Sequence, residues 1–173
     1  MDLKKLIRNV PDFPKAGIQF KDITTLLKDG AGFKESIEKM AEPWKDKKID
    51  KVAAIEARGF IIGAPIAEKL GAGLVLVRKK CKLPSKTLTV TYELEYGEDT
   101  LEVHEDSLRE GDNVLIVDDL LATGGTAAAA IKLVKSAGAE IAGLSFLIEL
   151  KGLNGQDMFG GYPVNTLISY EGV

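Results

Sequence analysis

Residues 114–126 read VLIVDDLLATGGT, and the rest of the chain can be interpreted around them. Residues 114–117 form an apolar run rich in β-branched side chains, typical of a strand buried on both faces of a parallel sheet. Asp118 and Asp119 follow at once, then a loop of small and hydroxyl residues, then strong helix formers over residues 127–136. The stretch predicts a strand, an acid pair, a glycine loop and a helix, in that order.

The loop after the acid pair has the composition of an anion site. In an open parallel sheet, ligands bind beyond the carboxyl ends of the strands, where the next helix presents unpaired N–H groups and the positive end of its dipole. Glycines let the backbone approach an oxyanion, and the threonine hydroxyls add two donors. The predicted ligand is a phosphate monoester. The predicted cradle consists of Ala122, Thr123, Gly124, Gly125 and Thr126.

Two common nucleotide-binding motifs do not match this stretch. No lysine follows the glycines as in a Walker loop, and the G-x-G-x-x-G of a dinucleotide fold is missing. The two carboxylates suit a ribose, because a vicinal diol offers two donors to two acceptors. Acid pair and loop together predict a site for a ribose 5-phosphate group. The structural alternative is a buried strand with a solvated Asp pair and a capped helix.

Over its whole length, this stretch resembles the signature of the type I phosphoribosyltransferases, in which an acid pair and a T-G-G-T loop bind phosphoribosyl pyrophosphate (PRPP). The resemblance implies an α/β fold, with a parallel sheet flanked by helices, a β-hairpin lid and an N-terminal hood. It also implies that Asp118 and Asp119 hold the ribose. The same two carboxylates offer support to Mg²⁺, directly or through water.

Length and composition limit the function further. The 173 residues are 45% hydrophobic and 28% charged, which suits one domain over residues 1–173 with a proper core. The net charge of −3 gives no support to a nucleic-acid or anionic-membrane partner. The single cysteine, Cys81, excludes an internal disulfide framework, and no run has the length and character of a signal peptide or membrane span. We expect a cytoplasmic protein.

The beginning of the chain predicts a short helix and then an irregular segment. Apolar residues stand at helical spacing in residues 2–9, and Pro11 ends that helix. Prolines and a glycine mark residues 10–28 as irregular.

Residues 10–28 resemble the hood of the adenine-specific phosphoribosyltransferases, with F-P-x-x-G, then F, a basic residue and D-I. The resemblance implies a hood over about residues 1–30. In it, Phe20 stacks on a purine, and the main chain around Gln19 and Lys21 reads the edge of the base.

A second strand–loop–helix unit lies earlier in the chain. Residues 52–55 predict a strand and residues 60–70 a helix, so Arg58 lies at the carboxyl edge of the sheet. A guanidinium there can clamp pyrophosphate in a bidentate manner. The structural alternative is an ion pair between Glu56 and Arg58. The resemblance implies a non-proline cis peptide near Glu56 and Ala57, with Ala57 and Arg58 at the pyrophosphate and Arg58 active in catalysis.

A basic run follows the strand predicted at residues 74–77. It contains Arg78, Lys79, Lys80 and Lys82. Such a run is often a solvated face, and nucleic-acid binding is disfavoured because the chain is acidic and no aromatic residues are interleaved. We interpret Arg78, Lys79 and Lys82 as pyrophosphate ligands. The resemblance implies a homodimer, in which some of these cations reach the partner's site.

Residues 87–103 change to a period of two with a turn at residues 97–99, which predicts a β-hairpin. The alternation alone places Glu95 on an exposed face. However, Glu95 and the two residues after it resemble the E-Y-G of the adenine-specific enzymes. The resemblance implies a lid over about residues 82–106 that excludes water, with Glu95 as general acid/base at the purine ring.

A helix predicted at residues 32–45 and strands at residues 142–150 and 166–170 complete the α/β fold. The resemblance covers nearly the whole chain and implies that the 5-phosphoribosyl group of PRPP is transferred to adenine, giving AMP and pyrophosphate, with Mg²⁺ as cofactor. One alternative is a phosphoribosyltransferase for another purine. Another is a non-catalytic regulator that senses PRPP or a purine.

Overall fold

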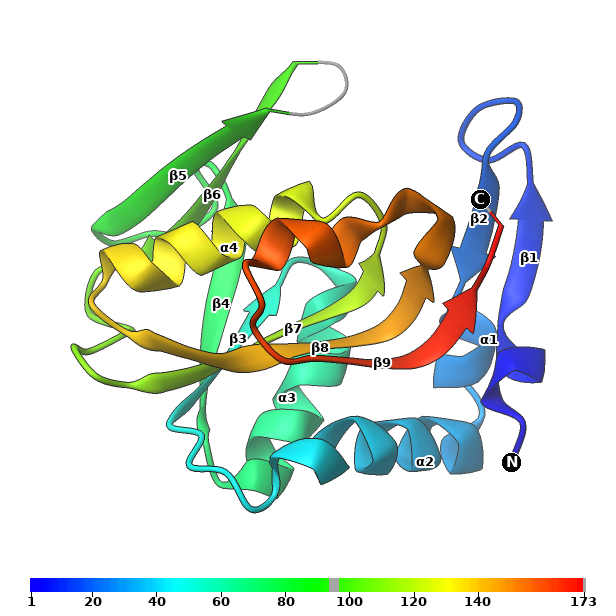
Figure 1. Ribbon diagram of the computed structural model, residues 1–173, viewed down its shortest axis with the longest axis horizontal. Helices are drawn as coiled ribbons and strands as arrows, with labels where there is room; N and C mark the ends of the chain where they lie inside the picture. The colour runs from blue at the N-terminus through cyan, green and yellow to red at the C-terminus, as the bar shows by residue number, and fades with distance from the viewer. Residues whose placement is uncertain (94–96, 173) are drawn as a thin grey trace.

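The structure is a computed structural model that describes residues 1–93 and 97–172 (Figure 1). Its parallel strands are β3 (Lys51–Ile55), β4 (Gly73–Lys79), β7 (Asn113–Leu121), β8 (Glu140–Leu150) and β9 (Val164–Tyr170). The antiparallel pair β5 (Thr87–Glu93) and β6 (Glu98–His104) extends the same sheet, in the order β5-β6-β4-β3-β7-β8-β9. The predicted α/β fold with a parallel core is confirmed.

Helices cover both faces of this sheet (Figure 1). They are α2 (Gly30–Ala41) and α3 (Arg58–Leu70) on one face and α4 (Gly125–Ser136) on the other. Short 3₁₀ segments are η2 (Glu42–Trp44), η3 (Lys151–Leu153) and η4 (Gly155–Phe159). The helix predicted at residues 32–45 ends earlier, at Ala41, because Pro43 lacks the N–H that an α-helix requires. None of the helices in the described ranges has the length and apolar character needed to cross a membrane.

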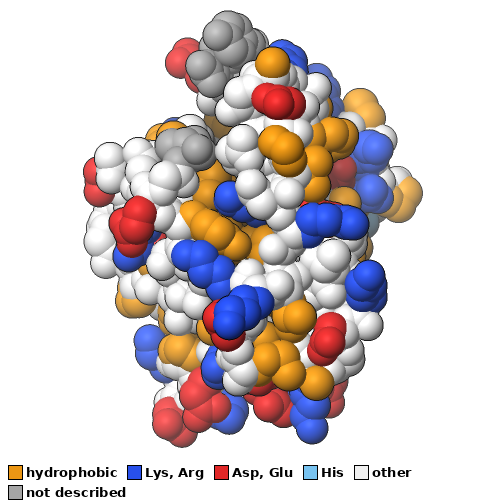
Figure 2. Space-filling model, turned by 90° about the vertical axis from the view of Figure 1, so that its right-hand side faces the viewer, with side chains coloured by type: hydrophobic (Ala, Val, Ile, Leu, Met, Phe, Trp, Pro, Cys, Tyr) orange, Lys and Arg blue, Asp and Glu red, His pale blue; other side chains and the backbone are white. Residues whose placement is uncertain are grey.

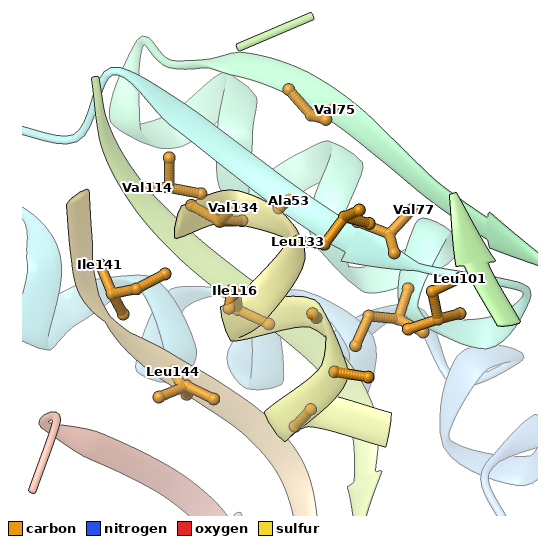
Figure 3. Close-up of a cluster of buried hydrophobic side chains, with 14 of the residues drawn as sticks. Ala53, Val75, Val77, Leu101, Val114, Ile116, Leu133, Val134, Ile141 and Leu144 are labelled. Atoms are coloured by element: carbon orange, nitrogen blue, oxygen red, sulfur yellow. The ribbon is translucent and has the colours of Figure 1, made fainter. Parts of the chain in front are cut away.

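β7 is buried on both faces, as its apolar run predicts. Val114 and Ile116 belong to the cluster of side chains under α4 (Figure 3), whereas Leu115 and Val117 belong to the cluster that α2 and α3 cover. Successive side chains of a strand point to opposite faces, so one continuous apolar run feeds two cores. This double anchoring fixes the position of the acid pair, which lies in the last part of β7.

The hood differs from its sequence prediction. The helix predicted over residues 2–9 is wrong: only η1 (Leu3–Leu6) is a 3₁₀ turn, and β1 (Arg8–Pro11) then pairs antiparallel with β2 (Gln19–Asp22). Helical spacing of apolar residues is a weak signal over so short a run, and strand pairing overrides it.

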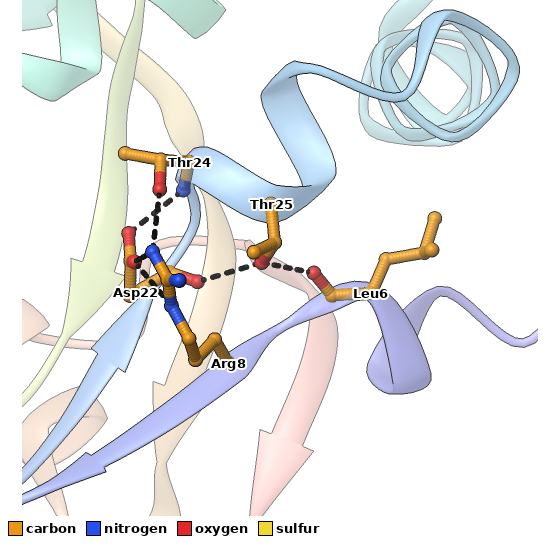
Figure 4. A network of polar contacts seen from close by, with 5 residues as sticks. All are labelled: Leu6, Arg8, Asp22, Thr24 and Thr25. Atoms are coloured by element: carbon orange, nitrogen blue, oxygen red, sulfur yellow. Dashed lines mark hydrogen bonds and ion pairs between the residues drawn. The ribbon is translucent and has the colours of Figure 1, made fainter.

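One carboxylate links the parts of the hood to each other. Asp22 accepts hydrogen bonds from Arg8 Nε at 2.9 Å and from the N–H of Thr24 at 2.9 Å (Figure 4). Thr24 begins the short helix α1 (Thr24–Leu27). The Thr25 hydroxyl donates to the carbonyl of Leu6 at 2.6 Å, so η1, the strands and α1 form one unit.

The predicted β-hairpin is observed as β5 and β6. It is continuous with the main sheet because Arg78 and Lys79 of β4 pair with Glu102 and Leu101 of β6. The base of the predicted lid is thus an edge of the sheet. Glu95 lies outside the described residues.

Candidate active site

A cavity of about 400 Å³ lies at the carboxyl ends of β3 and β7, where α3 and α4 begin. It gathers predicted site residues from three separate stretches of the chain. These are Ala57, Arg58, Lys79, Asp118, Asp119, Ala122, Thr123, Gly124, Gly125 and Thr126. The tertiary structure therefore brings the predicted ribose, phosphate and pyrophosphate ligands into one space.

The acid pair lies inside the last part of β7. The strand continues to Leu121 because β8 pairs with it beyond the acids, whereas the sequence pattern predicted its end before Asp118. The N–H of Asp119 donates to Asp118 Oδ1 at 2.8 Å. Asp119 is only 5% exposed, and its Oδ2 lies 2.8 Å from Arg58 Nε. That oxygen is buried beneath Arg58 and accepts no hydrogen bond of proper geometry within the described residues.

Burial raises the pKa of both carboxyls. The neighbouring charge of Asp119 raises the pKa of Asp118 further, whereas the Arg58 guanidinium opposes the rise in the pKa of Asp119. A buried carboxylate beside a partly buried one is costly without compensating donors or cations. A ribose diol and a divalent cation are ligands that provide them.

The glycine loop after β7 has little freedom of shape. Gly124 has φ +85°, in the left-handed region, and a Cβ there would lie 2.3 Å from the carbonyl oxygen of Gly155. Its own carbonyl accepts the N–H of Ala128 at 2.9 Å and starts α4. The hydroxyl of Thr126 lies 3.2 Å from Tyr92 Oη. The loop is thus fixed between the hairpin and the connection that follows β8.

Both cations in the cavity have carboxylate partners. Arg58, at the first position of α3, pairs with Asp119, and its guanidinium also lies 5.2 Å from the ring centre of Phe20. Lys79 Nζ lies 3.0 Å from Asp99 Oδ2. A pyrophosphate entering this space would compete with these carboxylates for the same cations.

The other predicted pyrophosphate ligands, Arg78 and Lys82, do not line this cavity. Arg78 Nε donates to Glu56 Oε2 at 2.9 Å, and one of its terminal nitrogens donates to the Lys82 carbonyl at 3.2 Å. The alternative ion pair between Glu56 and Arg58 is therefore not formed, because Glu56 is engaged by the next strand. The Glu56–Ala57 peptide is cis, as the resemblance implied.

The predicted adenine residues lie beside the cavity and are not part of its lining. Phe20 touches Phe13 edge-on, with ring centres 5.1 Å apart, and reaches the cavity through Arg58. Asn9 Nδ2 donates a hydrogen bond to Gln19 Oε1 at 2.7 Å, and Lys21 Nζ donates one to Asn9 Oδ1 at 2.8 Å. Their main chain belongs to β2. On this side of the molecule, Lys and Arg side chains lie across the middle of the face between hydrophobic ones (Figure 2).

Among the residues that line the cavity, sequence reasoning missed Tyr92, Asp99 and Phe146. Tyr92 belongs to the apolar positions of the alternating pattern in the hairpin, and that pattern predicts only that Tyr92 packs in the core. Asp99 stands in the predicted turn, and Phe146 in a buried strand. No local signal marks them, because only the folding of the hairpin and β8 against the loop brings them to the cavity. The predicted acid/base residue, Glu95, lies outside the described residues.

Comparison with known proteins agrees with this arrangement. The family model for the phosphoribosyl transferase domain matches residues 22–158. The chain therefore belongs to the phosphoribosyltransferase family.

Individual relatives of the chain show which member of this family it resembles. A curated adenine phosphoribosyltransferase of Clostridium perfringens is 57% identical over 99% of both chains. A crystal structure of the Thermoanaerobacter pseudethanolicus adenine phosphoribosyltransferase is 53% identical over 98% of both chains, with a TM-score of 0.95. The Saccharomyces cerevisiae enzyme, complexed with adenine and an imino-altritol bisphosphate, is 39% identical over 96% of both chains, with a TM-score of 0.90. Within the family, this chain belongs with the adenine phosphoribosyltransferases.

Proposed function

We propose that this protein transfers the 5-phosphoribosyl group from PRPP to adenine, giving AMP and pyrophosphate, as a purine-salvage enzyme. The observation that carries the proposal is the single cavity in which the acid pair, the glycine loop and two cations meet. Identity above 50% to relatives named for this reaction supports adenine as the base. The yeast relative was solved with adenine bound.

The ribose 5-phosphate half of PRPP would occupy the β7 side of the cavity. Asp118 and Asp119, which both line the cavity, would accept hydrogen bonds from the two ribose hydroxyls. The loop at residues 122–126 then meets the 5-phosphate with backbone N–H groups and threonine hydroxyls.

The pyrophosphate would occupy the side where Arg58 and Lys79 lie. As the bond from C1′ to the pyrophosphate oxygen breaks, a ring nitrogen of adenine forms its bond to C1′ and loses a proton. Negative charge moves onto the leaving pyrophosphate, where Arg58, Lys79 and the N–H of Ala57 stabilise it. In a homodimer, Arg78 and Lys82 would serve the partner's pyrophosphate, since neither lines the cavity of its own chain.

Mg²⁺ fits this donor set as a cofactor that arrives with PRPP. No cluster of three or more candidate ligand side chains occurs in the part of the chain that the structure describes. Mg²⁺ is commonly bound by one or two carboxylates together with substrate phosphates and water, and the adjacent Asp118 and Asp119 in the cavity match that pattern. When bound, the ion neutralises charge on the pyrophosphate and on the acid pair.

Adenine would lie between the cavity and the hood. Phe20 supplies a flat ring beside Arg58, and the main chain around Gln19 and Lys21 supplies hydrogen-bonding groups that identify the edge of the base. Glu95 would exchange the proton with the purine ring from the lid.

A homodimer is part of the proposal. Ile61 of α3 and Leu74 and Leu76 of β4 are exposed large hydrophobic side chains on neighbouring elements. Apolar side chains gathered in this way mark an association surface, here for a second copy of the chain. We assign the reaction to the cytoplasm, which suits the exposed, free Cys81.

The test is product formation from PRPP and Mg²⁺ with adenine, hypoxanthine, guanine, xanthine or orotate. We expect AMP from adenine and no nucleotide from the other bases. Product from another base would support the phosphoribosyltransferase activity but would contradict the proposal that the hood selects adenine. Binding of PRPP without any product would favour the regulator. Binding to nucleic acid that weakens steeply with salt would show a different use of the basic run.

A further inference from the structure

The connection between β8 and β9 has no role in the proposed reaction, yet it forms a wall behind the glycine loop. Its segment η4 lies beside α4, although the two are distant from each other in the sequence (Figure 1). Gly155, the first residue of η4, lies against the backbone of the glycine loop that precedes α4.

Gly155 and the glycine loop interlock. A Cβ at Gly155 would lie 2.3 Å from the carbonyl oxygen of Ala122 and 3.0 Å from the nitrogen of Gly124. In the other direction, a Cβ at Gly124 would lie 2.3 Å from the carbonyl oxygen of Gly155. Backbone atoms cannot turn aside as a flexible side chain does. The position of Gly155 therefore sets the position of the loop at residues 122–124.

A buried carboxylate holds the residue next to Gly155. Glu149, near the end of β8, is only 6% exposed. It accepts hydrogen bonds from Gln156 Nε2 at 2.5 Å and from the Thr166 hydroxyl at 2.9 Å. No cation pairs with it among the described residues. Burying a carboxylate against neutral donors lowers the stability of the fold compared with an apolar side chain. The structural effect of Glu149 is that its hydrogen bond holds Gln156 in place.

The far end of η4 is anchored on the cavity wall. Phe159 is buried and stacks on Phe146, with ring centres 6.1 Å apart and planes 14° apart. Phe146 lines the cavity. The segment is thus fixed at Gln156 by a hydrogen bond to Glu149 and at Phe159 by packing, and Gly155 lies against the loop.

We propose that Glu149, acting through Gln156 and Gly155, is a positioning residue for the phosphate loop and sets the affinity for the 5-phosphate of PRPP. The inference rests on the proposed function. Glu149 does not line the cavity, so it acts on the loop and not on the substrate. Its loss weakens PRPP binding and leaves the hood, and hence adenine binding, unchanged.

The experiment compares Glu149→Ala with the conservative variant Glu149→Gln, whose amide oxygen still accepts from Gln156. We expect Glu149→Ala to raise the KM for PRPP about tenfold, as loss of an outer-shell partner does elsewhere. The KM for adenine stays unchanged, and Glu149→Gln restores most of the PRPP affinity. Titration of the protein with PRPP and Mg²⁺ in the absence of adenine gives the same ranking of dissociation constants.

Gly155→Ala provides a second, independent variant, with Gly30→Ala as its control, because a Cβ at Gly30 meets open space. We expect Gly155→Ala to weaken PRPP binding at least as much as Glu149→Ala, and Gly30→Ala to change nothing. If Gly155→Ala fails to fold, the two Glu149 variants decide the matter.

An unchanged KM for PRPP in folded Glu149→Ala overturns the inference, and so does an equal rise in both KM values with a lower Tm. A wild-type protein that makes no nucleotide from any base refutes the proposed function instead. The two failures are therefore distinct.

Discussion

Arg58 makes the contacts that join the parts of the site. Its Nε lies 2.8 Å from Asp119, its guanidinium faces the ring of Phe20, and it lines the cavity. Lys79 has a similar position between the cavity and Asp99 of the hairpin. A polyphosphate that recruits these two cations must displace their carboxylates, so ligand binding would alter the contacts of both the hood and the hairpin.

The acid pair gives a prediction with opposite signs for activity and stability. Asp119→Asn should lower kcat/KM about 10²-fold, because the ribose loses a charged acceptor. The same change should raise Tm at neutral pH, since the raised pKa of Asp119 means that its ionised form opposes folding. As the pH falls toward the ordinary value of 3.8, both states take up the proton and the gain in Tm disappears.

Thermal melts between pH 8 and pH 4 without Mg²⁺, together with PRPP titrations, check this prediction. The exposed Asp46 provides the control variant Asp46→Asn, which should alter neither property. Normal PRPP binding by Asp119→Asn would contradict the ribose assignment.

At the scale of elements, the hood combines a polar network with buried side chains, Leu3, Ile23 and Leu26, that join the core under α2 and α3. β1 and β2 pair only with each other, and Asp22 ties both strands to the start of α1. The N–H of Thr24 and the Arg8 side chain lower the pKa of Asp22 to about 2. The ionised carboxylate therefore stabilises the folded hood.

Asp22→Asn should reduce the free energy of unfolding at pH 7 by about 2 kcal/mol, from a pKa near 2 in the folded state and 3.8 in the unfolded state. Because the folded pKa is lowered, the contribution of Asp22 is complete above about pH 4 and is lost as the pH falls through 2. Denaturant unfolding of both proteins across this range measures it. A difference in stability that stays constant down to pH 2 would show that the ion pair is not its source.

The helices and strands also show which sequence patterns predict secondary structure correctly. Runs that are long or buried on both faces, such as β7 and α4, were predicted within a few residues. The hood was predicted as helix and irregular chain but contains paired strands, because four-residue strands leave little periodicity to detect. Pro43 carried a signal for the end of α2 that the helical pattern concealed.

At the scale of the whole molecule, the proposed homodimer depends on an exposed apolar surface. Ile61, Leu74 and Leu76 are each at least 40% exposed. The same strand, β4, carries Arg78, which does not line the cavity of its own chain. Association would therefore bury the apolar side chains and bring basic residues toward the partner.

Leu76→Lys should convert the proposed dimer to a monomer, because a charge would replace an apolar side chain in the proposed contact. Analytical ultracentrifugation measures the mass, and the exposed Met158, which lies on η4, provides the control Met158→Lys. We expect the control to remain dimeric. A Leu76→Lys protein that also stays dimeric would place the interface elsewhere.

The sequence by itself determined the class of fold and the chemical groups of the site. A double-faced apolar strand, an acid pair and a glycine loop occur together at residues 114–126, so their local order specifies their placement at one sheet edge. Only the tertiary structure decided which carboxylate each cation faces, and that Tyr92, Asp99 and Gly155 border the site. These contacts join residues far apart in the chain, and no periodicity or spacing in the sequence records how such segments meet.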